Sequence, residues 1–164
     1  MNSTEPLLLT RDGAVATLTF NRPERLNAIS YAMFLQLPKL VDEAKAMPGL
    51  RALVLRGAGT RAFSAGADIS EFETTRMTSE HAAAYDDAVL AAEEAVATFP
   101  APTIAAVHGH CYGGGCALAI ACDIRFAAAA RGSRSPRRSS ALSTRCAAPS
   151  AWSTWSARPA PRSS

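Results

Sequence analysis

Three consecutive glycines, Gly113–Gly115, join a predicted strand to a predicted helix, and they constrain the chain more than any other feature. Because glycine costs conformational entropy on folding, three together indicate that another group approaches this backbone closely. The helix N-terminus that follows presents unpaired N–H groups and a positive dipole end. The stretch is typical of a site for a carbonyl oxygen, an oxyanion or a phosphate. Tight packing of a helix against a sheet is the alternative.

Up to residue 130 the chain alternates between predicted strands and predicted helices. Strands are expected at residues 7–9, 15–20, 51–56, 103–107 and 124–127, with a hairpin turn at Asp12-Gly13. Helices are expected at residues 30–47, 79–99 and 113–122. This order predicts an α/β fold with a layered sheet.

The two long helices carry further expectations. Ser30 can serve as the N-cap of the first, and Pro38 inside it is expected to kink or split it. Its predicted apolar positions are Leu35, Leu37, Leu40, Val41 and Ala44. In the second helix the acidic residues are expected to face solvent, namely Glu80, Asp86, Asp87, Glu93 and Glu94.

Charge is distributed unevenly along the chain. The net charge is +3, but residues 131–164 contain seven arginines and no acidic residue, which leaves −4 on residues 1–130. This tail also has ten serines and four prolines, and no Val, Ile, Phe or Tyr. Such a composition cannot offset the entropy of ordering with buried apolar surface, so the tail is predicted to be disordered. We expect no nucleic-acid partner; a tail that binds RNA or a phosphorylated partner is the alternative.

The cysteines are Cys111, Cys116, Cys122 and Cys146, and none forms a C-x-x-C pair. This pattern indicates buried thiols in a reducing compartment rather than a metal site or disulfides. The chain begins with no basic leader, and no apolar run reaches the ~18 residues of a membrane span. We therefore expect a cytoplasmic protein with no bound metal.

Three segments occur together in a characteristic order. They are Phe20–Ile29 (FNRPERLNAI), Ala62–Ile69 (AFSAGADI) and Ile104–Ile124, which includes the glycine run. In wording and spacing they resemble the crotonase superfamily, the enoyl-CoA hydratase/isomerase family, over roughly residues 6–130. The resemblance implies a spiral core of ββα units, incomplete in this chain, and an acyl-CoA thioester as substrate. It implies no cofactor beyond coenzyme A, and assembly as trimers or pairs of trimers.

The resemblance also implies roles for particular residues. The backbone N–H groups of Ala67 and Gly114 would form an oxyanion hole that holds the thioester oxygen as it becomes an enolate. The substrate-binding residues would be Arg25, Leu26, Ala65, Ala67, Asp68, Ile69, Ser70 and Gly114. Without the resemblance, Ala67 and Asp68 could be only a loop and the cap of a short helical turn from Ile69 to Phe72.

The chain departs from the family pattern at both glutamates that hydratases of this family use. The first would lie at Ala117, whose methyl group cannot transfer a proton. The second would fall after residue 130, in the tail, where nothing resembles the family. The expected domains are therefore residues 1–130, the N-terminal part of a crotonase-like domain, and residues 131–164, the tail. We expect a C-terminally truncated or frameshifted member of the family.

A shifted reading frame would explain the composition of the tail, because GC-rich coding DNA read out of frame yields Arg, Ser, Ala and Pro. One back-translation of residues 131–144, begun one nucleotide earlier, reads ARFAVPAAKLGIVY and resembles the family's next segment. The restored segment has alanine where the second hydratase glutamate is expected.

Three functions fit these observations: a lyase or isomerase of fatty-acid metabolism, a non-catalytic acyl-CoA binder, and an inactive product whose exposed face lacks its covering helices. Ala117 argues against efficient hydration, whereas isomerisation with a base placed elsewhere stays open. Four ionisable residues near the motifs are interpreted as pocket wall or solvated surface, namely His108, His110, Glu71 and Glu73. Asp123 is expected to cap or brace backbone.

Overall fold

Five strands form the main sheet of the computed structural model, which describes residues 5–71 and 79–128. The strands are β1 (Leu7–Asp12), β2 (Val15–Phe20), β3 (Ala52–Gly57), β5 (Thr103–Val107) and β7 (Ile124–Ala127), in the order β1-β2-β3-β5-β7. β1 and β2 pair antiparallel, and every later neighbour in the sheet is parallel. The predicted α/β class and its five strands are confirmed, with bounds that differ by a few residues.

Alternating burial along β2 explains how the sheet contributes to the core. Ala16, Leu18 and Phe20 are fully buried, as is Leu53 on the neighbouring strand. Side chains of a strand point alternately to its two faces, so these residues share one covered face. The predicted hairpin is present, with Asp12 opposite Val15 across the turn.

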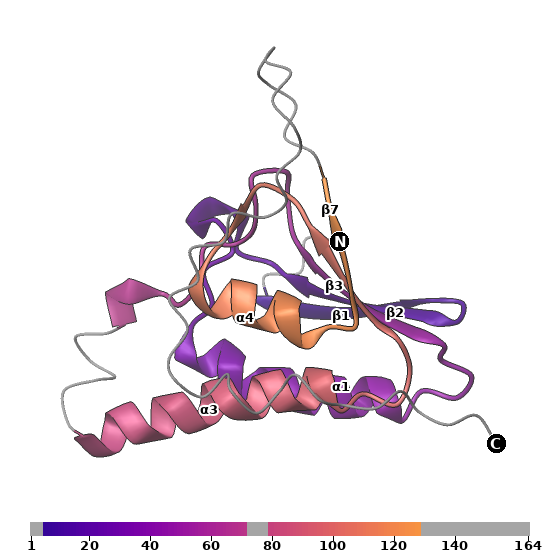
Figure 1. The fold of residues 1–164 in the computed structure, drawn as a ribbon, viewed down its shortest axis with the longest axis horizontal. Helices are drawn as coiled ribbons and strands as arrows, with labels where there is room; N and C mark the ends of the chain where they lie inside the picture. The colour runs from indigo at the N-terminus through magenta and orange to yellow at the C-terminus, as the bar shows by residue number, and fades with distance from the viewer. Residues whose placement is uncertain (1–4, 72–78, 129–164) are drawn as a thin grey trace, which may run out of the picture. The chain divides into compact units, whose positions relative to one another are not determined.

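Within residues 5–71 and 79–128, three α-helices pack with the main sheet (Figure 1). They are α1 (Tyr31–Lys45), α3 (Ser79–Ala97) and α4 (Gly113–Ala121). α1 and α3 pack along each other, α1 also contacts β1, and α4 contacts α3 and β5. Two short 3₁₀ turns are also present, η1 (Pro23–Arg25) and η2 (Ile69–Glu71). The helices bring Phe34, Leu37 and Val41 together with Ala92 and Leu118 in the core.

α1 confirms one expectation and corrects two, the split that was one of the two outcomes expected at Pro38 and the burial expected of Leu35. Ser30 is its N-cap, since its hydroxyl oxygen accepts a hydrogen bond from the Met33 N–H at 3.3 Å. Pro38 does not split the helix, which runs unbroken from Tyr31 to Lys45. The proline removes one N–H, while the buried side chains around it hold both halves against the core. Leu35, predicted to be a core position, is 47% exposed because it lies off the buried face.

α3 corrects a third expectation. Asp86, Asp87 and Glu94 are exposed as predicted, but Glu93 is half-buried. Burial raises the pKa of the Glu93 carboxyl, because desolvation disfavours its charged form. Glu93 is four residues from the half-buried Val89, at a spacing that shares a helix face, so it lies at the edge of the packed side of α3. The side chain of Glu80 lies outside the described residues.

The sequence patterns did not predict two very short strands. β4 (Ala62–Ser64) and β6 (His110–Cys111) pair in parallel as a separate two-stranded sheet. β4 lies in the Ala62–Ile69 motif, and β6 lies in the Ile104–Ile124 motif, just before the glycine run. The pairing places the two motif-bearing segments next to each other.

The end of the described region agrees with the expected role of Asp123. Its carboxylate accepts hydrogen bonds from the N–H and the hydroxyl of Thr103, each at 2.8 Å. This ties the start of β7 to the start of β5. Glu73 and the predicted tail, residues 131–164, lie outside the described residues. Among the described helices, none combines the length and the apolar character that a membrane span requires.

Candidate functional site

The two glycine-containing segments of the sequence meet at Gly66 and Gly113. A Cβ atom on Gly66 would lie 2.9 Å from the Tyr112 carbonyl oxygen, and a Cβ on Gly113 would lie 3.7 Å from the Gly66 Cα. Both glycines have positive φ, +94° and +48°, which side-chain-bearing residues rarely adopt. The Tyr112 N–H also donates to the Ser64 carbonyl at 3.0 Å. The two backbones are in close contact here, and at Gly66 they leave no room for a side chain.

Ala67 follows directly after this contact. It forms a parallel bridge with Ile29: the Ile29 N–H donates to the Gly66 carbonyl at 2.8 Å, and the Asp68 N–H donates to the Ile29 carbonyl at 2.9 Å. A bridge of this kind uses groups from the residues on either side of Ala67. Within the described residues, the Ala67 N–H has no hydrogen-bond acceptor.

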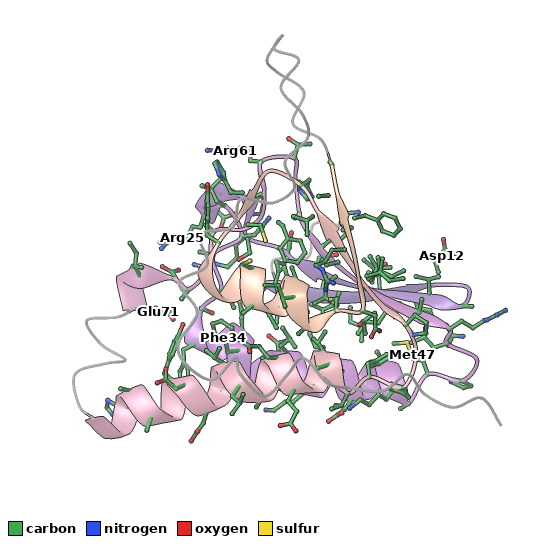
Figure 2. All side chains as sticks on the ribbon, viewed as in Figure 1. Asp12, Arg25, Phe34, Met47, Arg61 and Glu71 are labelled. Atoms are coloured by element: carbon green, nitrogen blue, oxygen red, sulfur yellow. The ribbon has the colours of Figure 1, made fainter. Side chains whose placement is uncertain are left out.

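Gly114 is the second residue of α4, where N–H groups lack an intrahelical acceptor. The next two N–H groups, of Gly115 and Cys116, both donate to the Tyr112 carbonyl. In the described part of the chain the Gly114 N–H has no such acceptor. A Cβ on Gly114 would lie 3.0 Å from the Phe34 ring, which Figure 2 shows beneath α4.

Gly115 fits tightly against β4. A Cβ there would lie 2.5 Å from the Cβ of Ser64, which is fully buried. The Ser64 hydroxyl in turn accepts from the Gly66 N–H at 3.1 Å. The third glycine therefore allows α4 to pack on the strand that leads into Gly66, so close packing and an open N–H group are both present in this loop.

A charged cluster flanks Ala67. The Asp68 carboxylate, 8% exposed, lies 2.9 Å from the Arg22 guanidinium and 3.6 Å from that of Arg25. It also accepts from the N–H and the hydroxyl of Ser70, at 3.2 and 2.7 Å. The hydrogen bond from the Ser70 hydroxyl, helped by Arg22, holds the pKa of Asp68 below its ordinary value. Asp68 thus caps the turn at Ile69, as predicted, and is also ion-paired.

The structure brings most of the predicted substrate-binding residues together. The Ala65 N–H donates to the Leu26 carbonyl at 2.9 Å, and Arg25 donates to the Ser70 hydroxyl at 3.3 Å. Ile69 is 75% exposed beside them. These contacts join the segment around residues 22–29 to the segment around residues 65–70.

Asn27 is a structural residue that the sequence analysis did not single out. It is fully buried at φ +56°, its amide donates to the carbonyls of Ala58 and Ala62 at 3.0 and 2.7 Å, and its oxygen accepts from the Arg22 N–H at 3.1 Å. Asparagine tolerates this backbone region better than most residues. An Asn in a polar connection between a strand and a helix is the signal that could have found it.

Three further ionisable residues near the motifs, Glu71, His108 and His110, differ in their surroundings. The Glu71 carboxylate accepts from the Tyr31 N–H at 2.8 Å, so it braces the start of α1 and is not the solvated group expected. His110 is exposed, with its ring 5.7 Å from that of Tyr112. His108 turns its Nε2 atom into the protein, where the described residues provide it with no hydrogen-bond partner.

Ala117 lies on α4, three residues after Gly114 and four after Gly113. Residues at these spacings share a helix face, so its half-buried methyl group lies on the face of α4 that includes Gly113 and Gly114, one turn from the open N–H. Burial raises the pKa of the Cys122 thiol, near the end of α4, to about 12, which keeps it a thiol. Among the described residues, no three His, Cys, Asp or Glu side chains group as metal ligands.

Comparisons with known proteins cover most of this chain. A family model described as enoyl-CoA hydratase/isomerase matches residues 10–134. A short-chain-enoyl-CoA hydratase of Clostridium acetobutylicum is 36% identical over 122 residues, which cover 74% of this chain and 46% of that protein. The chain spans about half the length of the curated relatives it matches.

Solved structures show the same likeness. An enoyl-CoA hydratase/carnithine racemase from Magnetospirillum magneticum matches with a TM-score of 0.72 at 45% identity, covering 76% of this chain and 47% of that chain. An enoyl-CoA hydratase from Bacillus anthracis matches with a TM-score of 0.70 at 31% identity, covering 75% and 47%. The predicted crotonase-like fold is confirmed for the matched part of the chain.

Proposed function

The chain belongs to the enoyl-CoA hydratase/isomerase family of the crotonase superfamily, and on this premise we propose that it binds an acyl-CoA thioester at the contact of Gly66 and Gly113. The thioester oxygen accepts hydrogen bonds from the N–H groups of Ala67 and Gly114. The observation that carries the proposal is the backbone contact between the two segments, each followed by an N–H without an acceptor in the described residues. Such donors stabilise negative charge that develops on a carbonyl oxygen.

The rest of the proposed site lies along the segments around residues 22–29 and 65–70, which hydrogen bonds join. Arg25, Leu26, Ala65 and Ser70 flank the coenzyme A part of the ligand, together with Asp68 and Ile69. Arg25 supports this assignment, because its guanidinium is about half exposed and retains donors beyond those that reach Asp68 and Ser70. The proposed chemistry needs no cofactor beyond the coenzyme A of the substrate and belongs to fatty-acid metabolism.

Ala117 favours binding over hydration. Hydration of a 2-enoyl thioester needs a group that delivers and removes protons beside the enolate, and a methyl group does neither. We therefore propose a thioester-binding protein whose hydratase activity is weak. Enolate chemistry with a base from another position, such as double-bond isomerisation, is the second candidate, because the oxyanion donors alone stabilise its intermediate.

Two substitutions at Gly114 test the proposal with a matched control. Gly114→Pro removes the N–H, and proline is tolerated in the first turn of a helix. Gly114→Ala keeps the N–H and places a Cβ against the same Phe34 ring, so it controls for the added bulk. The measurement is the dissociation constant for butyryl-CoA, a saturated thioester that cannot be hydrated, by calorimetry.

The proline variant is expected to bind butyryl-CoA about five- to tenfold more weakly than the alanine variant, because it has lost one hydrogen bond to the thioester oxygen. Isomerisation of a 3-enoyl-CoA to the 2-enoyl-CoA by the unchanged protein separates the two candidates: tight binding of butyryl-CoA with no isomerisation supports a binder, and isomerisation supports the second candidate. Equal affinities of the two variants would remove Gly114 from the site. Failure of the unchanged protein to bind butyryl-CoA would overturn the proposal as a whole.

A further inference from the structure

Asp68 is a nearly buried carboxylate that adjoins the proposed donor Ala67. Its side chain is 8% exposed, and both oxygens are engaged: one by Arg22 at 2.9 Å and Arg25 at 3.6 Å, the other by the N–H and hydroxyl of Ser70. A carboxylate with this many partners has little freedom to rotate. The backbone on either side of it is therefore held as well.

Arg22 connects this carboxylate to the strand-like segment that Ala67 lies against. Its guanidinium donates to the Ala28 carbonyl at 2.9 Å and pairs with Asp68, and only 18% of its side chain is exposed. Its own N–H is fixed by the buried Asn27 at 3.1 Å. Arg22 thus bonds the residue just before Ile29 and the residue just after Ala67.

This arrangement encloses the Ile29–Ala67 bridge. The bridge consists of two backbone hydrogen bonds, one to the Gly66 carbonyl, which shares its peptide plane with the Ala67 N–H, and one from the Asp68 N–H. The path from Ala28 through the Arg22 guanidinium to Asp68 closes a ring around it. Since the N–H direction follows the peptide plane, the ion pair limits the angle at which Ala67 can donate.

We propose that Asp68 is a positioning residue, whose ion pair with Arg22 aims the Ala67 N–H at the thioester oxygen; this rests on the function proposed above. The two arginines also neutralise a carboxylate that would otherwise repel an oxyanion formed nearby. Buried ion pairs contribute little net stability compared with apolar residues of the same shape. A positioning role explains why a charged pair lies at this point of the fold.

The test measures the polarisation of a bound carbonyl. Butyryl-CoA labelled with ¹³C at its thioester carbonyl is bound to the full chain, and isotope-edited infrared spectroscopy records the carbonyl stretch, which falls in frequency as hydrogen bonds to the oxygen strengthen. Asp68→Asn keeps the size of the side chain and removes its charge. Asp123→Asn is the matched control, since Asp123 also accepts from a backbone N–H and a hydroxyl, those of Thr103, which begins another strand.

Asp68→Asn is expected to lose about half of the frequency shift, because one of two donors is misdirected, while Asp123→Asn keeps the full shift. Arg22→Lys is the milder variant for the case in which Asp68→Asn does not fold, since lysine keeps the positive charge but cannot bond the Ala28 carbonyl and Asp68 at once as the guanidinium does. This variant is expected to lose part of the frequency shift. A full shift in both Asp68→Asn and Arg22→Lys, or in whichever of them folds, would overturn the positioning role and leave the proposed function intact. No shift in the unchanged protein would overturn both.

Discussion

Gly66 and Tyr112 are in backbone contact, since a Cβ on Gly66 would lie 2.9 Å from the Tyr112 carbonyl oxygen. The contact joins two segments that lie 46 residues apart in the chain. It places the residue before Ala67 against the residue before Gly113. No side chain larger than hydrogen fits, and the positive φ of Gly66 independently disfavours any other residue.

Gly66→Ala is therefore expected to destabilise the fold by roughly 3 kcal/mol, from the left-handed backbone and the clash together. Gly13→Ala is the control, because Gly13 also has positive φ but has no atom within 4 Å of its would-be Cβ. It should cost only about 1 kcal/mol. Urea denaturation of both variants measures the difference. Equal losses would show that the contact at Gly66 can open at little cost.

The stability supplied by Asp68 depends on pH in a defined direction. Its pKa in the folded protein lies below the ordinary 3.8, chiefly through the Ser70 hydroxyl, so the folded state favours the charged carboxylate. This contribution is present in full above the unfolded-state pKa and is lost as the pH falls through the folded-state value. Asp68→Asn should thus have a lower free energy of unfolding than the unchanged protein at pH 7, and this difference should become smaller below about pH 4. Denaturation at pH 7, 5 and 3 checks this; a gap independent of pH would contradict it.

Glu93 shows the opposite dependence. Its pKa is raised above the ordinary 4.5 by burial, so the charged carboxylate costs stability at neutral pH and the cost disappears as the pH falls below 4.5. Glu93→Gln is expected to raise the melting temperature at pH 7, by a stabilisation of up to about 1 kcal/mol after solvent screening, and to have little effect at pH 4. Glu94→Gln, one residue along and exposed, should change little at either pH. A stabilisation by Glu94→Gln of the same size would assign the effect to net charge instead.

Much of the fold could be predicted because its main elements carry strong local patterns. β2 alternates apolar and polar residues, and Ser30 marks the start of α1 as an N-cap should. By contrast, β4 and β6 are too short to show a period, and each is defined only by its pairing with the other, between segments that lie far apart in the chain. Local pattern also cannot say which side of a helix a second helix will cover.

The candidate site, too, could be predicted from the sequence only in part. Ala67 and Gly114 could be proposed because the surrounding motifs are distinctive. The bonds of Arg22 and Asn27 could not, because they depend on tertiary contacts with carbonyl groups as far as 35 residues away. Glu71 was predicted to lie on a solvated surface, but its carboxylate accepts a hydrogen bond from the Tyr31 N–H at 2.8 Å, which is also a tertiary contact.

The coding DNA offers a prediction about the tail. The match to the family model ends at residue 134, and the composition changes after residue 130. Insertion or deletion of a single nucleotide near the codons for residues 127–133 should therefore restore an apolar, family-like continuation. Sequencing of the gene decides this: if neither alternative frame reads as apolar segments with strand or helix periodicity, the frameshift hypothesis is wrong.

Ala117→Glu tests whether the rest of the site is formed. The glutamate would project from the α4 face that includes Gly114, one turn from the open Gly114 N–H, since residues three apart share a helix face. A carboxyl group placed there could exchange protons with a bound enolate. Hydration of crotonyl-CoA should rise at least about tenfold, below the 10²- to 10⁴-fold typical of an optimised acid–base group. Ala121→Glu is the control, because it adds the same carboxyl one turn farther from the donors and should leave the rate unchanged. A rate unchanged in Ala117→Glu, with butyryl-CoA still bound, would place the reacting carbons away from this helix face.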